Sequence, residues 1–340
     1  MTGRGAALHR VPARLLGAAC LLLLLLFGTA GSTVVRGVQT RSAAAAPSQP
    51  RLSAGPFAGR ALFASPHSAA AHAAAAGHSP VLRRLAQVPQ AIWLSGGSPD
   101  AVARAVGVAA REAEQASSVP VFVLYDIPHR DCGDGQSAGG AQSAADYRRF
   151  VSAFVRADAG RPAIVVLEPD SLAQLDCLSP AQRAGRITLL RWAVGVLSGP
   201  HLAVYLDGGV RGWKSAQTMA QRLDAAGVAH ARGFAVNVAN YDGTSDETAY
   251  GLAISAHIGW KHFVIDTSRN GRPGTSGHWC NVPGMAVGAL PGTPVDSRAV
   301  DALLWIKPPG ESDGSCGAGP RPAGRFDPGA ATALMRRAGY

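Results

Sequence analysis

One segment limits the possible folds more than any other: the apolar run Ala163–Leu167, which leads into Glu168, Pro169 and Asp170. The run is short, rich in β-branched residues and without polar–apolar alternation, as in strands covered on both faces of a parallel α/β sheet. Pro169 cannot donate to a sheet ladder, so we expect the strand to end there. Asp170 then follows a buried strand, where α/β proteins place reactive groups. Taken alone, helix capping by Asp170 is an equally good interpretation.

Similar runs alternate with helix-like segments along the rest of the chain. Strands are expected over residues 91–95, 121–126, 163–168, 202–206, 233–237, 263–265 and 302–306. Helices are expected over residues 81–88, 100–116, 141–158, 179–198, 215–227 and 328–338. This alternation predicts an α/β fold with seven parallel strands and the helices outside. Right-handed crossovers would bring the carboxyl ends of all strands to one face.

Chemically useful side chains follow most of these strands. They are Asp126 and Asp131, Asp170, Asp207, Asn237 and Asn240, Asp266, and finally Lys307, Glu311 and Asp313. Acids after five of seven strands are hard to explain as caps, because clustered carboxylates raise each other's pKa. A division into protonated and ionised acids is what cleavage of a glycosidic bond by two carboxylates requires.

Tryptophans support a sugar substrate. Trp93, Trp213 and Trp279 lie in or beside strand-end loops, where an indole can stack on the apolar face of a pyranose. Trp192, Trp260 and Trp305 lie in helical or strand context, and we expect them to serve packing.

The N-terminal region predicts export. Residues 1–30 combine a basic start, an apolar core over 15–27 and a small-residue end, which is typical of a signal peptide. A retained membrane anchor is the weaker alternative, because the apolar core is shorter than the ~20 residues of a spanning helix. Residues 31–55, rich in Ala, Ser and Pro, are expected to be a disordered spacer, and 56–340 one large domain.

The net charge of +10 does not indicate nucleic-acid binding. Nine arginines and no acid precede Asp100, and beyond residue 99 the chain has 23 basic and 22 acidic residues. Once Cys20 is removed with the signal, four cysteines remain, which in an exported chain favour two disulfides with three possible pairings. A four-cysteine zinc site lacks its CxxC pair. The spacing of His67, His72 and His78 fits no common metal motif, so we expect surface histidines and no metal.

Seven motifs together resemble glycoside hydrolase family 6, the endo-β-1,4-glucanases and cellobiohydrolases. They are LYDIPHRDCG (124–133), VVLEPDSLA (165–173), VYLDGGVRGW (204–213), AVNVANY (235–241), VIDTSRNG (264–271), HWCN (278–281) and WIKPPGESDG (305–314). The resemblance runs in order from about residue 56 to the C-terminus. It implies a distorted seven-stranded α/β barrel, TIM-barrel-like, and inverting hydrolysis of β-1,4-glucan without metal or organic cofactor.

The resemblance also implies roles for single residues. Asp170 resembles the general acid, Asp131 the auxiliary carboxylate that keeps it protonated, and Asp313 the proposed base, whose role is disputed within the family. Tyr125 resembles the tyrosine that favours distortion of the sugar, and Ser137 a loop serine that helps to hold the water. Substrate-site positions are implied for Trp93, Trp213, Asn237, Asn240, His278, Trp279, Lys307 and Glu311. Asp207 and Asp266 resemble buried acids of the same site, Asp207 as electrostatic support. The cysteine positions imply the pairs Cys132–Cys177 and Cys280–Cys316.

Two features bear on the mode of action. Val210 stands where the family usually has His, which affects one substrate hydrogen bond. Only Gly314 and Ser315 separate Asp313 from Cys316, and this short turn resembles the endo type with an open groove. We therefore expect a secreted, monomeric endoglucanase that binds β-1,4-glucan, plant cellulose or an envelope polymer of the host, and neither nucleic acid nor membrane. An exo-acting cellobiohydrolase and a non-catalytic glucan-binding relative are the alternatives.

Overall fold

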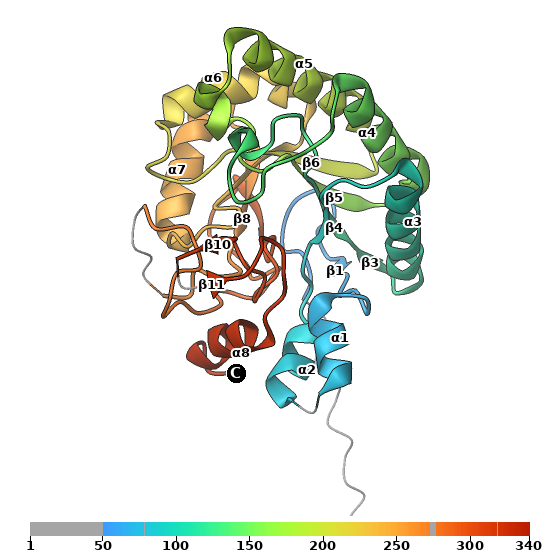
Figure 1. Ribbon diagram of the computed structural model, residues 1–340, viewed down its shortest axis with the longest axis vertical. Coiled ribbons are helices and arrows are strands. Elements are labelled where there is room, and N and C mark those ends of the chain that lie inside the picture. Colours follow the sequence, from blue (N-terminus) through green and yellow to red (C-terminus); the bar gives the residue numbers. More distant parts are fainter. Residues whose placement is uncertain (1–49, 78, 273–276, 318) are drawn as a thin grey trace, which may run out of the picture. The chain divides into compact units, whose positions relative to one another are not determined.

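A computed structural model describes residues 50–77, 79–272, 277–317 and 319–340. Seven parallel strands form one curled sheet, and their order in the sheet is their order in the chain (Figure 1). They are β2 (Ile92–Leu94), β4 (Val121–Leu124), β5 (Ala163–Leu167), β6 (Leu202–Asp207), β7 (Gly233–Val236), β8 (His262–Asp266) and β9 (Val300–Leu304). The predicted fold class, a distorted seven-stranded α/β barrel, is confirmed.

Helices cover the outside of the sheet in an arc (Figure 1). They are α3 (Pro99–Gln115), α4 (Ala144–Asp158), α5 (Pro180–Leu197), α6 (Ala216–Ala225) and α7 (Thr244–His257). The first four begin at a serine whose hydroxyl accepts a backbone N–H, and Ser179 with Gln182 forms a full capping box. At each of these four helix N-termini, a serine side chain thus accepts a hydrogen bond from a backbone N–H that has no partner within the helix.

Both faces of the central strands are buried, which explains their unalternated sequences. Val165 and Leu167 point toward the helices and join the larger hydrophobic cluster, which includes Phe154 and Leu190. The alternate residues, such as Val166, point into the barrel and join an inner cluster. Because side chains alternate along a strand, each face needs its own apolar set.

The two edges of the sheet, β2 and β9, meet through the backbone of flanking residues. Ala91 N–H donates to the carbonyl oxygen of Trp305 at 2.9 Å, whereas every neighbouring pair from β2 to β9 forms a ladder. The sheet therefore curls until β2 approaches β9, but no ladder of hydrogen bonds joins these two strands. In this arrangement β2 lies between β9 and β4. This order decides which strand-end loops become neighbours.

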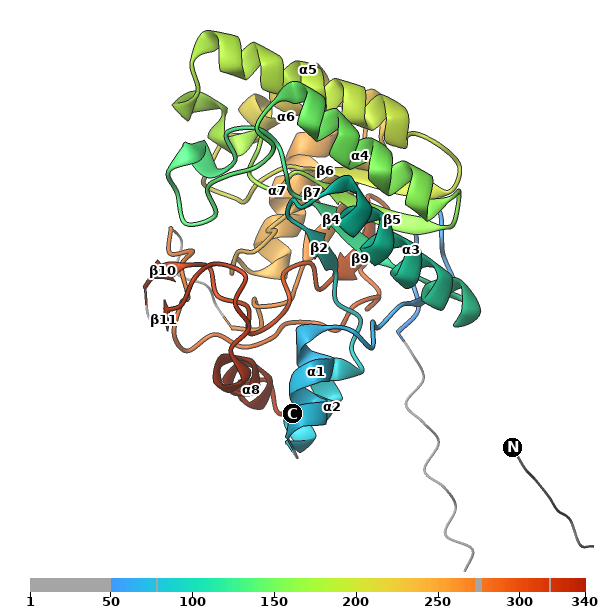
Figure 2. The same cartoon turned by 45° about the vertical axis from the view of Figure 1, so that its right-hand side comes forward.

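The remaining elements lie at the termini and in loops. An unpredicted helix, α1 (Ala69–Ala76), begins at the capping residue Ser68 and follows from the high helix propensity of alanine. Together with α2 (Pro80–Ala86) and α8 (Pro328–Arg337) it forms a separate apolar cluster, away from α3, α4 and α5 (Figure 2). Three 3₁₀ turns are η1 (Asp131–Gly133), η2 (Ala173–Cys177) and η3 (Val228–His230). Short strand pairs are β1 (Ala61–Leu62) with β3 (Ser118–Val119) and β10 (Ser315–Cys316) with β11 (Gly319–Pro320).

The expected signal peptide, residues 31–49 of the expected spacer and His78 lie outside the described residues. His67 and His72 are exposed, as the sequence predicted. Residues 50–55 differ from the prediction of disorder: Leu52 is buried, and its N–H donates to the carbonyl oxygen of Arg60 at 2.9 Å. Within the described ranges, no helix has the length and apolar character needed to cross a membrane.

Candidate active site

A cleft of about 420 Å³ lies at the carboxyl ends of the strands. Most of the residues predicted for the site line it: Trp93, Tyr125, Asp131, Ser137, Asp170, Trp213, Asn240, His278, Trp279, Lys307 and Asp313. Trp93 lies in β2 and the other residues come from the six loops after β4 to β9, so the parallel sheet does bring distant motifs together. Four further candidates, Asp207, Asn237, Asp266 and Glu311, are absent from the lining of this cleft.

Asp170 occupies a turn with positive φ directly after β5 and is half-buried. Its N–H donates to Oδ2 of Asp207 at 2.9 Å, which fixes the turn. Burial raises the pKa of Asp170 from 3.8 to about 7, and the Asp131 carboxylate adds to the rise. Lys307 and the Tyr125 hydroxyl oppose it. A carboxyl group with this pKa can hold a proton near neutral pH and give it up.

Asp131 is held by two donors, one on each oxygen. Ser137 N–H donates to Oδ2 at 2.8 Å, and Gln174 Nε2 donates to Oδ1 at 2.9 Å. The loop closes tightly around the carboxylate, because a Cβ on Gly135 would lie only 2.2 Å from Oδ2. Position 135 therefore excludes every other residue unless the loop moves.

Gln174 physically links the two acids. Its backbone N–H donates to the carbonyl oxygen of Asp170 at 2.9 Å, while its side chain donates to Asp131. The disulfide Cys132–Cys177 joins η1 to η2, the turns that carry Asp131 and Gln174. The spacing between the two carboxyl groups thus depends on local covalent and hydrogen-bonded links.

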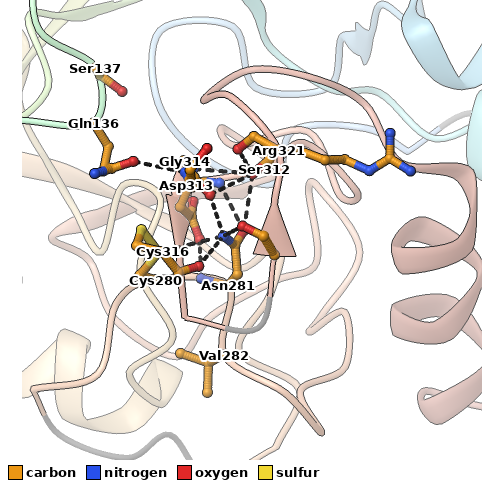
Figure 3. Close-up of a disulfide and its surroundings, with 12 residues drawn as sticks. Gln136, Ser137, Cys280, Asn281, Val282, Ser312, Asp313, Gly314, Cys316 and Arg321 are labelled. Atoms are coloured by element: carbon orange, nitrogen blue, oxygen red, sulfur yellow. Dashed lines mark hydrogen bonds between the residues drawn. A yellow bond between two sulfur atoms is a disulfide. The ribbon is translucent and has the colours of Figure 1, made fainter.

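Asp313 lies in the loop after β9 and is buried, with donors on both oxygens. Arg269 Nη1 lies 2.8 Å from each oxygen, and this ion pair is almost completely buried. The Tyr241 hydroxyl donates to Oδ2 at 3.1 Å and the Asn281 N–H at 2.8 Å. Figure 3 shows Asn281 beside Asp313 and the disulfide Cys280–Cys316. Both disulfide pairs implied by the family resemblance are therefore confirmed.

Aromatic and cationic groups pack around the acids. The rings of Trp93 and Tyr125 meet edge to face at 5.3 Å between centroids, and Lys307 Nζ lies 5.4 Å from the centre of the Trp93 ring. The Arg130 guanidinium lies 4.5 Å from the Tyr125 ring. Burial and the nearby Asp170 and Asp131 carboxylates raise the pKa of Tyr125, so its hydroxyl stays protonated.

Exposed indoles flank the cleft. Trp213 is 39% exposed and Trp279 is 49% exposed, and both line the cleft. Of the three tryptophans expected to serve packing, Trp305 is buried and Trp192 is partly buried. The expectation is wrong for Trp260, which is 65% exposed: it follows α7 in a left-handed turn that directs the ring outward.

Two of the four candidates outside the cleft, Asp266 and Asn237, hold neighbouring loops through hydrogen bonds. Asp266 accepts four backbone N–H groups, from Ala239, Ser268, Ile306 and Lys307. Asn237 is fully buried and bonds the backbone of Asp242 and Asp266. Asp266 is thus a buried acid, as the resemblance implied, whereas direct substrate contact by Asn237 is wrong, because all its side-chain polar atoms are bonded internally.

Asp207 and Glu311 also lie away from the cleft surface. Asp207 is buried, and its Oδ2 holds the N–H groups of Asp170 and Gly209. Burial and the Asp170 charge raise the pKa of Asp207 well above its ordinary value. Glu311 lines a neighbouring cavity of about 250 Å³ and lies 3.7 Å from Lys307 Nζ. Asp207 thus holds the turn of Asp170, and Glu311 lies beside Lys307, which lines the cleft.

Val210 does line the cleft at the position where the resemblance would place His. The next residue, Arg211, also lines it and has Nη2 at 3.5 Å from both Asp242 and Asp246. The Arg211 guanidinium therefore offers hydrogen-bond donors next to Val210, the position at which the family usually has His.

Several residues of the site escaped the sequence analysis. They are Gln136, Gln174, Tyr241, Arg269 and Asn281. Gln174 lies four residues after Asp170, so the backbone bond of a helical turn could have indicated it. Arg269 and Asn281 lie inside quoted motifs but gave no signal, because only the folded loops bring them to Asp313. Within the described part of the chain, no group of three or more His, Cys, Asp or Glu side chains is placed to hold a metal ion.

Comparisons with known proteins agree with this geometry. A family model described as Glycosyl hydrolases family 6 matches residues 57–337. Endoglucanase A of Cellulomonas fimi is 43% identical over 242 residues, which are 71% of this chain and 52% of the relative. Endoglucanase 1 of Streptomyces halstedii is 41% identical over 280 residues, covering 78% of this chain and 86% of the relative. The chain thus spans about half the length of the first of these proteins.

Solved structures give the same result. The endoglucanase Cel6 from Mycobacterium tuberculosis, in complex with methyl-cellobiosyl-4-deoxy-4-thio-β-D-cellobioside, has a TM-score of 0.81 and 44% identity over 84% of this chain and 100% of its own. The catalytic core of the cellobiohydrolase Cel6A from Chaetomium thermophilum has a TM-score of 0.74 and 28% identity over 84% of this chain and 98% of its own. Fold, cleft and sequence together place this chain in family 6 of the glycosyl hydrolases.

Proposed function

We propose that this chain is an inverting endo-β-1,4-glucanase that cleaves internal bonds of cellulose or a related β-glucan. The observation that carries the proposal is the pair of acids in the cleft. Asp170 has a pKa of about 7, and the Asp131 charge beside it favours the protonated form. Exposed indoles on the same cleft suit stacked sugar rings.

In the proposed mechanism Asp170 protonates the glycosidic oxygen as the bond breaks. The Asp131 carboxylate beside it favours the protonated form of Asp170 until the substrate arrives. Tyr125, packed between Trp93 and Arg130, crowds the sugar at the cleavage point and favours a distorted ring. Trp93, Trp213, Trp279, Asn240, His278 and Lys307 are assigned to binding the glucan.

In this mechanism water enters on the face of the sugar opposite the acid, and Asp313 and Ser137, which both line the cleft, help to hold it. We assign Asp313 to polarising this water, directly or through solvent, since Arg269, Tyr241 and Asn281 already donate to its oxygens. Because these donors hold both of its oxygens, the Asp313 carboxylate has a fixed orientation toward the water. The Ser137 N–H is bonded to Asp131, which holds that loop at the cleft.

Endo action is favoured over exo action by two observations. The endoglucanases quoted above are 41% and 43% identical to this chain, whereas 1,4-beta-D-glucan cellobiohydrolases C of Aspergillus species are 32% to 33% identical. The turn between Asp313 and Cys316 has only two residues, which is too short to roof the cleft by itself.

The proposal includes export. The basic and apolar start of the chain suits a signal peptide, and the two disulfides suit an oxidising compartment. In this proposal residues 1–30 are removed, residues 56–340 form the catalytic domain, and the mature enzyme acts as a monomer.

The test is a product analysis with purified protein. Release of reducing sugar from carboxymethylcellulose separates an enzyme from a non-catalytic glucan-binding protein. Products of cellohexaose, with the anomer formed first followed by NMR, then test the mechanism: we expect the α anomer. Initial formation of the β anomer would contradict inversion, and release of cellobiose only, from chain ends, would favour the exo alternative.

Asp131→Asn is expected to move the pH profile. The acid must be protonated in the free enzyme, so kcat/KM of the wild type should fall as the pH rises through about 7. Without the Asp131 charge, one cause of the raised pKa is lost, and the falling limb should move to lower pH. The profile of kcat/KM on cellohexaose measures this shift. An unmoved limb would show that Asp131 does not act on Asp170.

A further inference from the structure

A buried arginine on α5 contacts the two loops that carry the acids of the cleft. Arg186 is only 3% exposed and is absent from the lining of the cleft. Its Nη2 donates to the carbonyl oxygens of Pro128 at 2.9 Å and His129 at 2.6 Å, in the loop after β4. Its Nη1 donates to the carbonyl oxygen of Ser171 at 3.2 Å, in the turn after β5. One guanidinium therefore joins the backbones of both loops.

The contacted carbonyl groups lie close to the two acids along the chain. His129 lies two residues before Asp131, and Ser171 directly follows Asp170. The other links between these loops, the Gln174 side chain and the disulfide of η1 and η2, attach at Asp131 or after it. The chain that leads into Asp131 therefore has an anchor of its own, and this anchor also holds the turn of Asp170.

The two anchored segments have uncommon backbone conformations. Five of their residues other than glycine have positive φ: His129, Asp131, Cys132, Glu168 and Asp170. Such conformations persist only where the surrounding structure fixes them. The planar guanidinium suits this task, because its donors point in fixed directions and can reach several carbonyl oxygens at once.

A second buried side chain holds the same segment from the end of β5. Glu168 is fully buried, and its Oε2 accepts the N–H groups of Asp126 at 3.0 Å and Ile127 at 2.9 Å. Arg186 bonds the carbonyl groups of the next two residues along the chain. The loop after β4 is therefore held through its amides by Glu168 and through its carbonyl oxygens by Arg186.

Burial of the Arg186 guanidinium is unfavourable by itself. Burial lowers the pKa of this group, although the neighbouring Glu168 opposes the change. An apolar side chain on α5 would fill the same space without this desolvation. What arginine adds is the set of three bonds to carbonyl oxygens, so we assign it to holding the loops and not to packing.

We propose that Arg186 is a positioning residue that sets the spacing between the Asp131 and Asp170 carboxyl groups by joining the loop after β4 to the turn after β5. It acts through the backbone, since it does not line the cleft. The inference rests on the proposed glucanase function, in which the Asp131 charge favours the protonated form of Asp170.

The test compares the wild type with Arg186→Lys, Asp131→Asn, the double variant of these two, and Arg191→Lys. Lysine keeps the positive charge of residue 186 but lacks the planar fork that reaches three carbonyl groups. Arg191 is the matched control, because it lies on the same helix and donates through Nε and Nη2 to the carbonyl oxygen of Ala225, where α6 ends. The readout is the pH profile of kcat/KM on cellohexaose, with kcat and KM also measured separately.

The falling limb of this profile depends on the charged and titratable groups that face Asp170. They are Tyr125 and Asp131 from the segment after β4, Asp207 from the end of β6, and Lys307 and Asp313 from the loop after β9. Arg186→Lys changes none of these groups. A moved limb would therefore report a change in their distances from Asp170.

For Arg186→Lys we expect the limb to move about half a pH unit to lower pH, because a more distant Asp131 charge raises the pKa of Asp170 less. Coulomb's law gives this change at an effective dielectric constant of about 20 when two charges about 5 Å apart separate by about 1 Å more. The value of kcat should fall about tenfold to hundredfold, as for reacting groups displaced by about 1 Å. KM should stay within about twofold, since the indoles of the cleft are unchanged.

The control and the double variant separate positioning from a merely structural role. Arg191→Lys should match the wild type. The double variant should have its limb where Asp131→Asn alone has it, because the charge whose distance changes is no longer present. If Arg186→Lys does not fold, Arg186→Met replaces it, since methionine leaves no cation to be buried.

Two results would overturn the proposal. One is a limb at the wild-type position in the folded variant of Arg186, whatever its thermal stability. The other is a double variant whose limb moves well beyond that of Asp131→Asn. If the wild type hydrolyses no β-glucan at all, the proposed function fails and this inference fails with it.

Discussion

Asp170→Asn is expected to lower kcat on cellohexaose about 10³-fold while leaving the fold intact. The amide cannot donate a proton to the leaving oxygen, and general acid catalysis contributes factors of about 10²–10⁴. The backbone of the turn is held through the Asp170 N–H and Oδ2 of Asp207, a bond that the substitution keeps. Steady-state kinetics and the thermal unfolding curve measure the two halves of this expectation.

A substrate with a better leaving group provides the control. Dinitrophenolate leaves without protonation, so a dinitrophenyl β-cellobioside should be hydrolysed by Asp170→Asn at a rate near that of the wild type. An equal loss on both substrates would mean that Asp170 positions the sugar or the water instead of donating a proton. Loss of the cooperative unfolding transition would make either result uninformative, which is why the unfolding curve is measured first.

Arg269→Met is expected to give the largest loss of stability. Its guanidinium forms an almost completely buried ion pair with Asp313, lies 4.2 Å from the centre of the Tyr241 ring and donates to the carbonyl oxygen of Ala239. Removing one partner of a buried pair leaves an uncompensated charge, which costs about 3–5 kcal/mol. Thermal and urea unfolding should show this loss, and activity should fall because Asp313 loses its orientation.

The double variant Arg269→Met with Asp313→Asn separates the charge effect from the packing effect. Removing the stranded carboxylate should recover about 1 kcal/mol or more relative to Arg269→Met alone. Additive losses from the two substitutions would contradict the ion-pair explanation. Asp313→Asn alone leaves Arg269 unpaired in the same place, so it should also destabilise, although Asn281 and Tyr241 can still bond the amide.

The sequence predicted the sheet well because its strands are buried on both faces. An unalternated run of five apolar residues, such as 163–167, indicates a strand that is buried on both faces. The serine caps mark where the helices begin. Helix α7 escaped prediction because its buried face mixes the apolar Tyr250 and Ile254 with Glu247, Gly251 and Ser255, so it has no continuous apolar stripe. Its buried Gly251 fits against Phe263, where a Cβ would lie 2.4 Å from the ring.

The sequence predicted which loops carry the residues of the site, but not which atoms those residues contact. A position after a strand places a residue at the correct face of the barrel, and this sufficed for Asp131, Asp170 and Asp313. The family resemblance implied a buried acid at Asp266, but not that its carboxylate would accept four backbone amides, because that depends on the paths of its own loop and two others. For the same reason Gln136 and Arg269 became visible only in the folded structure.

The placement of the two cystines has a consequence for maturation of the enzyme. Cys132–Cys177 and Cys280–Cys316 fasten the loops of Asp131 and Asp313, whereas the seven strands of the main sheet and their apolar clusters contain none of these cysteines. A chain made in a reducing cytoplasm should therefore acquire its barrel and remain dormant until it reaches an oxidising compartment. Treatment with dithiothreitol should abolish most glucanase activity while far-ultraviolet circular dichroism stays unchanged, and reoxidation should restore the activity. Unfolding of the reduced protein, or full activity in the reduced state, would contradict this role of the two disulfides.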